Sequence, residues 1–182
     1  MSNPSQAFSV ETETETETET DRRSAFLESL NERDITKALD DQISVYGRLL
    51  GLRRKSGRAF NLVKMIKTGL PLSAGETLAA HIGMDSKKFF IAYVGMSDST
   101  LRRRLRDKQP LSVDESDRVV RYAHLLSLAT NLLSGCEEDA REWLASPAQA
   151  LGGATPLETA VTETGARRVE DVILALEYGM FS

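Results

Sequence analysis

The stretch from residue 95 to residue 126 constrains the fold most, because two helices of opposite character meet there at a proline. In the first, Leu101 and Leu105 stand one helical turn apart, and four of the five residues after Leu101 are arginines. Pro110 ends this helix, since proline lacks a backbone donor and disfavours helix in the residue before it. In the second, Ser112 and Glu115 have the spacing of a capping box, which predicts a helix start.

The first helix is too rich in cations to be buried. A turn at Gly95 precedes it, and Ser97 or Asp98 can cap its start by accepting a backbone N–H bond. We expect its two leucines to lie in a small core and its arginines to face phosphate, as in a recognition helix. The second helix is long and amphipathic, because apolar residues recur in it for about five turns. These residues are Val119, Tyr122, Ala123, Leu126, Ala129, Leu132 and Leu133.

Charge is segregated along the 182 residues, although the net charge is only −4. Residues 1–21 carry −6 and residues 22–47 carry −1, whereas residues 48–108 carry +10 and residues 109–182 carry −7. This pattern predicts a polyanionic partner for the middle and a basic partner for the C-terminal part. No apolar run reaches the ~18 residues that a membrane helix needs, and the N-terminus has no basic-then-apolar leader. With a single cysteine, Cys136, these features lead us to expect a cytoplasmic protein without membrane contact.

The first 60 residues divide into an acidic tail and a helical extension. Glu-Thr pairs fill residues 11–20, where like charges repel and apolar side chains are missing, so we expect residues 1–23 to be a disordered tail. Such a tail either stays solvated, which its composition favours, or mimics DNA. Residues 24–60 are the expected helical extension with its basic linker, and residues 24–52 within them predict one or two amphipathic helices, the second near residues 34–50. A basic linker follows, which either touches phosphates or is solvated.

Residues 61–110 predict a helix-turn-helix DNA-binding domain. Short helices joined by a glycine-containing turn make this motif, and the surrounding positive charge strengthens the assignment. Phe89, Phe90 and Tyr93 are the aromatic core candidates. The expected helices span residues 61–68, 74–82, 85–94 and 98–108.

Residues 111–182 predict a second group of helices. Thr155 and Glu158 form another capping box, with Pro156 at the first helical position, and we expect that helix to end near residues 162–165. The other expected helices span residues 113–134, 137–145, 148–151 and 166–178. The last helix should place four apolar residues on one face: Val169, Val172, Ile173 and Leu176. Because the sequence contains no convincing strand, the predicted fold class is all-α.

Several short motifs follow Pro110 at characteristic spacings. They are ESDR at 115–118 with Arg121 three residues on, AREWL at 140–144, Pro147, ALGG at 150–153, TPLE at 155–158, TE at 162–163, GA at 165–166, Val169 and YG at 178–179. Together they resemble the Xre/MbcA/ParS antitoxin family. The resemblance covers roughly residues 62–182, and its C-terminal half is the specific part, because helix-turn-helix elements are common.

The resemblance implies a type II antitoxin with an Xre-like helix-turn-helix domain, residues 61–110, and a helical toxin-binding domain, residues 111–182. Such proteins dimerise, neutralise a RES-domain toxin that depletes NAD, and repress their own operon by binding operator DNA. Their C-terminal end typically occludes the active site of the toxin. In this sequence that end consists of Tyr178, Gly179, Met180, Phe181 and Ser182. No catalytic residue and no cofactor is implied, and the resemblance says nothing about the residues before 62.

The candidate DNA contacts lie on the polar faces of the arginine-rich helix. Crowded arginines repel one another, and a polyanionic partner relieves that repulsion, so we favour DNA binding over a merely solvated cationic helix. Bidentate arginine–guanine contacts are the expected source of specificity. The candidate residues are Ser99, Thr100, Arg102, Arg103, Arg104 and Arg106.

Other polar residues give no sign of catalysis or metal binding. His81 and His124 lack further ligands at metal-binding spacing. Four charged residues of the long helix have the three-residue spacing of Glu–Arg and Asp–Arg ion pairs, and their place in the motif set indicates a structural link between the domains. They are Glu115, Asp117, Arg118 and Arg121.

The apolar pair at 180–181 either folds back on its own domain or fills a pocket of a partner, and the resemblance favours the pocket. The sequence therefore predicts a non-enzymatic, homodimeric antitoxin and autorepressor. Its partners are a cognate RES-domain toxin and operator DNA, with no small-molecule substrate. The alternative is a stand-alone helix-turn-helix regulator or DNA-localising factor without a toxin.

Overall fold

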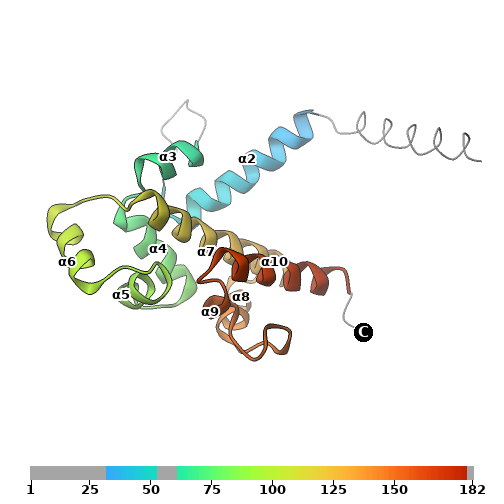
Figure 1. The fold of residues 1–182 in the computed structure, drawn as a ribbon. Coiled ribbons are helices and arrows are strands. Elements are labelled where there is room, and N and C mark those ends of the chain that lie inside the picture. Colours follow the sequence, from blue (N-terminus) through green and yellow to red (C-terminus); the bar gives the residue numbers. More distant parts are fainter. Residues whose placement is uncertain (1–31, 53–60, 180–182) are drawn as a thin grey trace, which may run out of the picture. The chain divides into compact units, whose positions relative to one another are not determined.

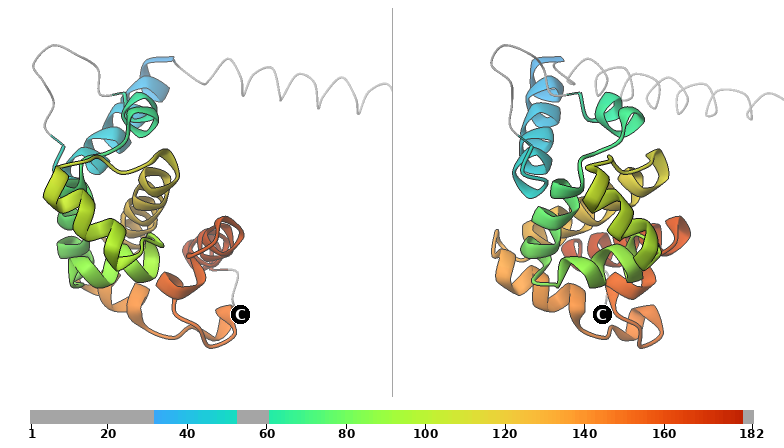
Figure 2. Two further views of the ribbon diagram at one scale, coloured as in Figure 1. Left: turned by 60° about the vertical axis from the view of Figure 1, so that its left-hand side comes forward. Right: turned by 90° about the vertical axis from the view of Figure 1, so that its left-hand side faces the viewer.

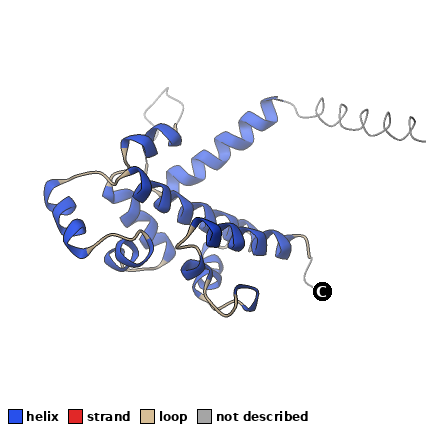
Figure 3. Ribbon diagram, in the orientation of Figure 1, coloured by secondary structure: helices blue, strands red, loops and turns tan. Residues whose placement is uncertain are grey.

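The computed structural model describes residues 32–52 and 61–179. Every regular element in these ranges is a helix, so the predicted all-α class is confirmed (Figure 3). The helices are α2 (Glu32–Leu49), α3 (Leu62–Thr68), α4 (Leu72–Ile82), α5 (Ser86–Lys88), the π-helical η1 (Phe89–Tyr93), α6 (Asp98–Asp107), α7 (Val113–Leu132), α8 (Glu137–Ala145), the 3-10 helix η2 (Gln149–Leu151), α9 (Pro156–Thr159) and α10 (Glu163–Glu177). None of these described helices combines the length and apolar character needed to cross a bilayer.

The chain divides into two compact units after Gln42. Helix α2 runs across this division, and its bounds confirm the helix expected near residues 34–50. The expected tail, residues 1–23, lies outside the described residues, as does most of the basic linker. All packing described below belongs to the second unit, which begins at Ile43.

Helix α7 is the centre of the second unit. It contacts α3, α4, α8 and α10, and α10 runs alongside it in both Figures 1 and 2. Its buried side chains point to several sides, as expected for a helix that neighbours surround on most of its circumference. They are Ser116, Val119, Tyr122, Ala123, Leu125, Leu126 and Ala129.

The C-terminal end of α2 is part of the same core. Tyr46, Leu49 and Leu50 are buried there. The Tyr46 hydroxyl lies 2.7 Å from Nδ1 of His124 on α7, and Arg48 forms a 2.8 Å ion pair with Glu137 on α8. A segment that precedes the family motifs therefore helps to build the folded unit.

The expected helix over residues 85–94 is present as α5 continued by η1. Asp85 caps its start by accepting a hydrogen bond from the backbone of Lys88. Phe89 and Phe90 are buried as predicted, whereas Tyr93 is only partly buried. The chain then turns at Gly95, whose positive φ of 78° suits a residue without a Cβ.

The last helices differ from expectation at one junction. The helix that starts with the Thr155 capping box ends at Thr159 rather than near residues 162–165, and α10 begins at Glu163 instead of residue 166. The reason is that Thr162 caps α10 by accepting a hydrogen bond from the backbone of Gly165. Val169, Val172 and Ile173 are buried as predicted, but Leu176, in the last turn of α10, is 41% exposed.

Candidate functional site

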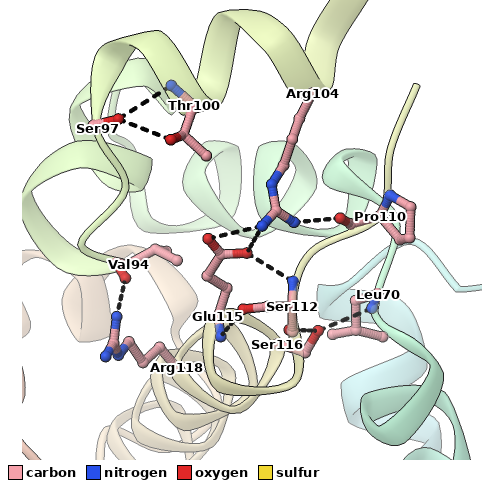
Figure 4. A network of polar contacts seen from close by, with 10 residues as sticks. All are labelled: Leu70, Val94, Ser97, Thr100, Arg104, Pro110, Ser112, Glu115, Ser116 and Arg118. Carbon is pink, nitrogen blue, oxygen red and sulfur yellow. Dashed lines mark hydrogen bonds and ion pairs between the residues drawn. The ribbon is translucent and has the colours of Figure 1, made fainter. Parts of the chain in front are cut away.

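Helix α6 is the arginine-rich helix of the sequence, and Ser97 caps it. The Ser97 hydroxyl accepts a 3.1 Å hydrogen bond from the backbone of Thr100 and donates to the Thr100 hydroxyl (Figure 4). It also lies 3.0 Å from the Ser99 hydroxyl. Lys87 and Arg102 both pair with Asp98 in the first turn. The hydrogen bond from Lys87 holds the pKa of the Asp98 carboxyl below its ordinary range.

Three arginines of α6 are exposed. The side chains of Arg102 and Arg106 are both 74% exposed, and among the described residues each pairs with one acid of its own helix, Asp98 and Asp107 respectively. Arg103 is exposed and has no ion pair with any described residue. Ser99 is exposed and Thr100 is partly buried near the helix start. The structure therefore leaves four of the six candidate DNA contacts exposed on one short helix, with Thr100 partly buried beside them.

Arg104 differs from its neighbours, because its side chain is only 14% exposed. Its Nη2 atom lies 2.9 Å and 3.2 Å from the two carboxylate oxygens of Glu115 on α7, and its Nη1 atom donates to the carbonyl oxygen of Pro110 (Figure 4). The expectation that Leu105 lies in the core is wrong, since that side chain is 50% exposed. The inward face of α6 consists of Leu101 and Arg104, because the ion pair with α7 rotates residue 104 inward.

Three of the four charged residues singled out on α7, namely Glu115, Arg118 and Arg121, reach other elements rather than one another. Arg118 donates a 2.7 Å hydrogen bond to the carbonyl oxygen of Val94, at the start of the turn before α6. Arg121 forms a 2.8 Å ion pair with Glu163 in the first turn of α10. The predicted local ion pairs are therefore wrong: charged side chains gain more from carbonyls and carboxylates at neighbouring helix ends. The same contacts confirm that this part of α7 links the helix-turn-helix to the C-terminal helices.

An exposed apolar surface lies at the end of α10. Leu174 and Leu176 are more than one-third exposed, and Tyr178 is 74% exposed. Tyr178 and Gly179 are the last described residues, so of the five candidate toxin contacts the structure places these two. Met180, Phe181 and Ser182 lie outside the described residues.

A hollow of about 530 Å³ lies between the end of α2, α7 and α10. His124 stands in it, with Nδ1 at 2.7 Å from the Tyr46 hydroxyl and Nε2 at 3.6 Å from a carboxylate oxygen of Glu170. Arg121 and Glu163 line the same hollow and are paired with each other. Among the described residues no three His, Cys, Asp or Glu side chains are grouped to hold a metal ion.

Helix α5 with η1, the short turn at Gly95 and helix α6 are two helical segments joined by a glycine-containing turn, which is the arrangement of a helix-turn-helix protein. Comparison with known families agrees: residues 62–124 match the antitoxin Xre-like helix-turn-helix domain, and residues 128–179 match the antitoxin Xre/MbcA/ParS C-terminal toxin-binding domain. The two matches adjoin within α7.

Curated relatives agree with these matches. The chain is 31% identical over 135 residues to antitoxin Xre of Yersinia enterocolitica, which covers 74% of this chain and 89% of that protein. It is 38% identical over 80 residues to antitoxin Xre of Pseudomonas putida, covering 44% of this chain and only 50% of that protein. A relative from Sphingobium sp. named Prs ADP-ribosylating antitoxin is 29% identical over 128 residues, covering 66% of this chain and 80% of that protein.

The chain belongs to the Xre/MbcA/ParS antitoxin family, as the motifs between residues 115 and 179 predicted. It is a non-enzymatic antitoxin with a helix-turn-helix DNA-binding domain and a C-terminal toxin-binding domain.

Proposed function

We propose that this antitoxin neutralises a RES-domain toxin that depletes NAD, and that it binds operator DNA to repress its own operon. The observation that supports this most is the presence of two unlike exposed surfaces on one unit. The outer face of α6 is cationic, and the end of α10 is apolar. In this proposal residues 61–110 bind DNA and residues 111–182 bind the toxin.

For DNA, we propose contacts from Ser99, Thr100, Arg102, Arg103 and Arg106. The exposed guanidinium groups suit phosphate oxygens and the O6 and N7 atoms of guanine. A homodimer would present two copies of α6, so the operator should be an inverted repeat.

Arg103→Ala tests this surface, with Arg167→Ala as the control. Arg167 is likewise an exposed arginine, but it lies on α10, so both variants lose the same charge at different surfaces. We expect Arg103→Ala to weaken binding to the chain's own promoter duplex about tenfold or more, as measured by fluorescence anisotropy. Equal affinity of the two variants would show that α6 is not the recognition helix.

For the toxin, we propose that Tyr178, Gly179, Met180, Phe181 and Ser182 enter the toxin's active site. Deletion of residues 179–182 should leave the antitoxin folded and DNA-binding but unable to restore growth when co-expressed with the toxin from the adjacent reading frame. Full neutralisation by the truncated chain would contradict occlusion by this end.

The name of the Sphingobium relative indicates a second toxin class, one that transfers ADP-ribose. Both classes consume NAD, and the product distinguishes them. The test uses NAD labelled in its ADP-ribose part. A RES-type toxin should lower cellular NAD and leave proteins unlabelled, whereas an ADP-ribosylating toxin should attach labelled ADP-ribose to a protein target. If no neighbouring protein is neutralised while promoter binding persists, the chain is a stand-alone regulator.

A further inference from the structure

Apolar packing alone does not fix the orientation of α6. Of the ten residues from Asp98 to Asp107, only Leu101 is buried. A single buried side chain leaves a helix free to tilt and to rotate about its own axis. A helix that has to place guanidinium groups against base edges needs additional constraints.

Two polar contacts from α7 supply these constraints. At one end of α6, Arg104 is held by the Glu115 carboxylate and by the carbonyl oxygen of Pro110. At the other end, Arg118 holds the carbonyl oxygen of Val94, just before the turn. Glu115 and Arg118 lie one helical turn apart on α7, and Figure 4 shows both reaching toward α6 and its preceding turn.

The Glu115 carboxylate is itself held in place. Its Oε2 atom accepts a 2.7 Å hydrogen bond from the backbone of Ser112, which completes the capping box of α7. Beneath it, the buried Ser116 hydroxyl donates to the carbonyl oxygen of Ser112 and accepts a hydrogen bond from the backbone of Leu70. The capping box therefore holds the carboxylate directly, and Ser116 holds the Ser112 backbone to which that carboxylate is bonded (Figure 4).

We propose that Glu115 and Arg104 are positioning residues for DNA binding and that Arg104 makes no contact with DNA. Arg118 is a third positioning residue, through its hydrogen bond to the carbonyl oxygen of Val94. Glu115 neutralises the Arg104 guanidinium within the protein, and that pairing turns the exposed arginines outward. This inference rests on the proposed function of α6 as the recognition helix, and it specifies how the protein orients that helix.

The decisive comparison is Glu115→Gln against Asp117→Asn. Both changes remove one negative charge from the first turns of α7, and glutamine can still accept the capping hydrogen bond. Asp117 is exposed and forms no ion pair with any described residue. If only net charge mattered, both variants would bind the promoter duplex more tightly. We expect Asp117→Asn to bind as tightly as the unchanged protein or more tightly, and Glu115→Gln to bind about tenfold more weakly.

Salt dependence separates positioning from phosphate contact. Loss of a phosphate contact lowers the slope of log K against log salt concentration by about one. Arg104→Met and Arg104→Lys should both weaken binding without changing this slope, because methionine lacks the guanidinium fork and lysine cannot reproduce it. A slope reduced by about one in Arg104→Met, or full affinity in Arg104→Lys, would overturn the proposal.

Toxin neutralisation and helix content serve as the measure of folding, since the proposed toxin contacts follow α10, whereas Glu115 lies in the first turn of α7. If Glu115→Gln unfolds, Arg118→Gln replaces it and should give the same weaker binding at unchanged slope. Loss of promoter binding by Arg103→Ala together with full binding by folded Glu115→Gln would overturn the positioning role and leave the proposed function intact. Unchanged binding by both variants would show that α6 is not the recognition helix, and the proposed positioning role would then fail as well.

Discussion

The first turn of α10 passes so close to the end of α9 that a Cβ atom on Gly165 would lie 1.8 Å from the carbonyl oxygen of Thr159. The obstacle is backbone, which cannot rotate away as a flexible side chain can. The same glycine donates its backbone N–H to the Thr162 hydroxyl that caps α10. Glycine at position 165 therefore allows the start of α10 to approach the end of α9 this closely.

Gly165→Ala should destabilise the protein by about 2–3 kcal/mol, because overpacking against backbone forces α9 and α10 apart. The loss should appear as a lower midpoint in urea unfolding followed by circular dichroism. Toxin neutralisation should fall with it, because α10 carries the proposed toxin contacts.

The control is Gly47→Ala on α2. Gly47 is also a helical glycine, but among the described residues its Cβ would meet the carbonyl oxygen of Leu52 alone, at an ordinary 3.4 Å. Alanine is the better helix former, so we expect this variant to be unchanged or more stable by up to about 1 kcal/mol. A Gly165→Ala protein as stable as Gly47→Ala would contradict the tight α9–α10 corner.

Local signals in the sequence predicted most of the helix starts. Both capping boxes form as expected, because Ser112 with Glu115 and Thr155 with Glu158 need only their own helical turn. The end of the helix that follows Thr155 is predicted too late, because the apolar residues Ala160 and Val161 continue beyond Thr159, where the helix ends. The signal that was missed is Thr162, a good capping residue placed three before a glycine.

The partners of the arginines could not be predicted, because they depend on tertiary structure. Arg104, Arg118 and Arg121 pair with groups 6 to 42 residues away in the chain. Sequence spacing alone favoured solvent, DNA or a neighbouring acid for each of them. Successive residues of a helix point about 100° apart. Because Arg104 faces Glu115 on α7, the next residue, Leu105, faces solvent.

Tyr122→Phe should cost about 1 kcal/mol of folding free energy. The Tyr122 side chain is buried between α7 and α9, and its hydroxyl donates a 3.2 Å hydrogen bond to the carbonyl oxygen of Leu157. Burial also raises the pKa of this phenol above its ordinary value, which favours the protonated, donating form. Urea unfolding should show the loss, as the Leu157 carbonyl is left without this donor.

Tyr93→Phe is the matched control, since it removes the same oxygen from a ring 5.7 Å away that packs edge-on against Tyr122. The Tyr93 hydroxyl makes no hydrogen bond with any described residue, so this variant should stay within about 0.5 kcal/mol of the unchanged protein. Equal losses in both variants would mean that the hydrogen bond to α9 contributes nothing specific.

Glu137 joins three helices and should make stability depend on pH in the acid range. Its two carboxylate oxygens lie 2.8 Å from Nη1 of Arg48 on α2 and 2.6 Å from Nδ1 of His81 on α4. Partial burial alone would raise the pKa of this carboxyl, but the hydrogen bonds from Arg48 and His81 outweigh burial and hold the pKa below the ordinary 4.5. A depressed pKa adds stability above about pH 4.5, and that stability is lost as pH falls through the folded-state pKa.

Glu137→Gln should therefore be less stable than the unchanged protein at pH 7, by about 0.5–1 kcal/mol. The difference should shrink below about pH 4.5 and vanish once Glu137 is protonated. Urea unfolding at a series of pH values measures it, with the exposed Glu138→Gln as the control. A difference that stays constant from pH 7 to pH 3 would show that the carboxylate charge does not stabilise this junction.

The end of α2 should be required for the fold although it precedes the family match at residue 62. Leu49 is 1% exposed in the common core, so Leu49→Ala should destabilise the protein by about 2–5 kcal/mol. Leu105→Ala is the control, because Leu105 is also a helical leucine but is 50% exposed, and its loss should cost less than about 1 kcal/mol. Promoter binding and toxin neutralisation should fail together in Leu49→Ala as the temperature rises, since this core supports both surfaces. If the two leucine variants are equally stable, α2 contributes nothing to the antitoxin core and residues 62–179 should fold without it.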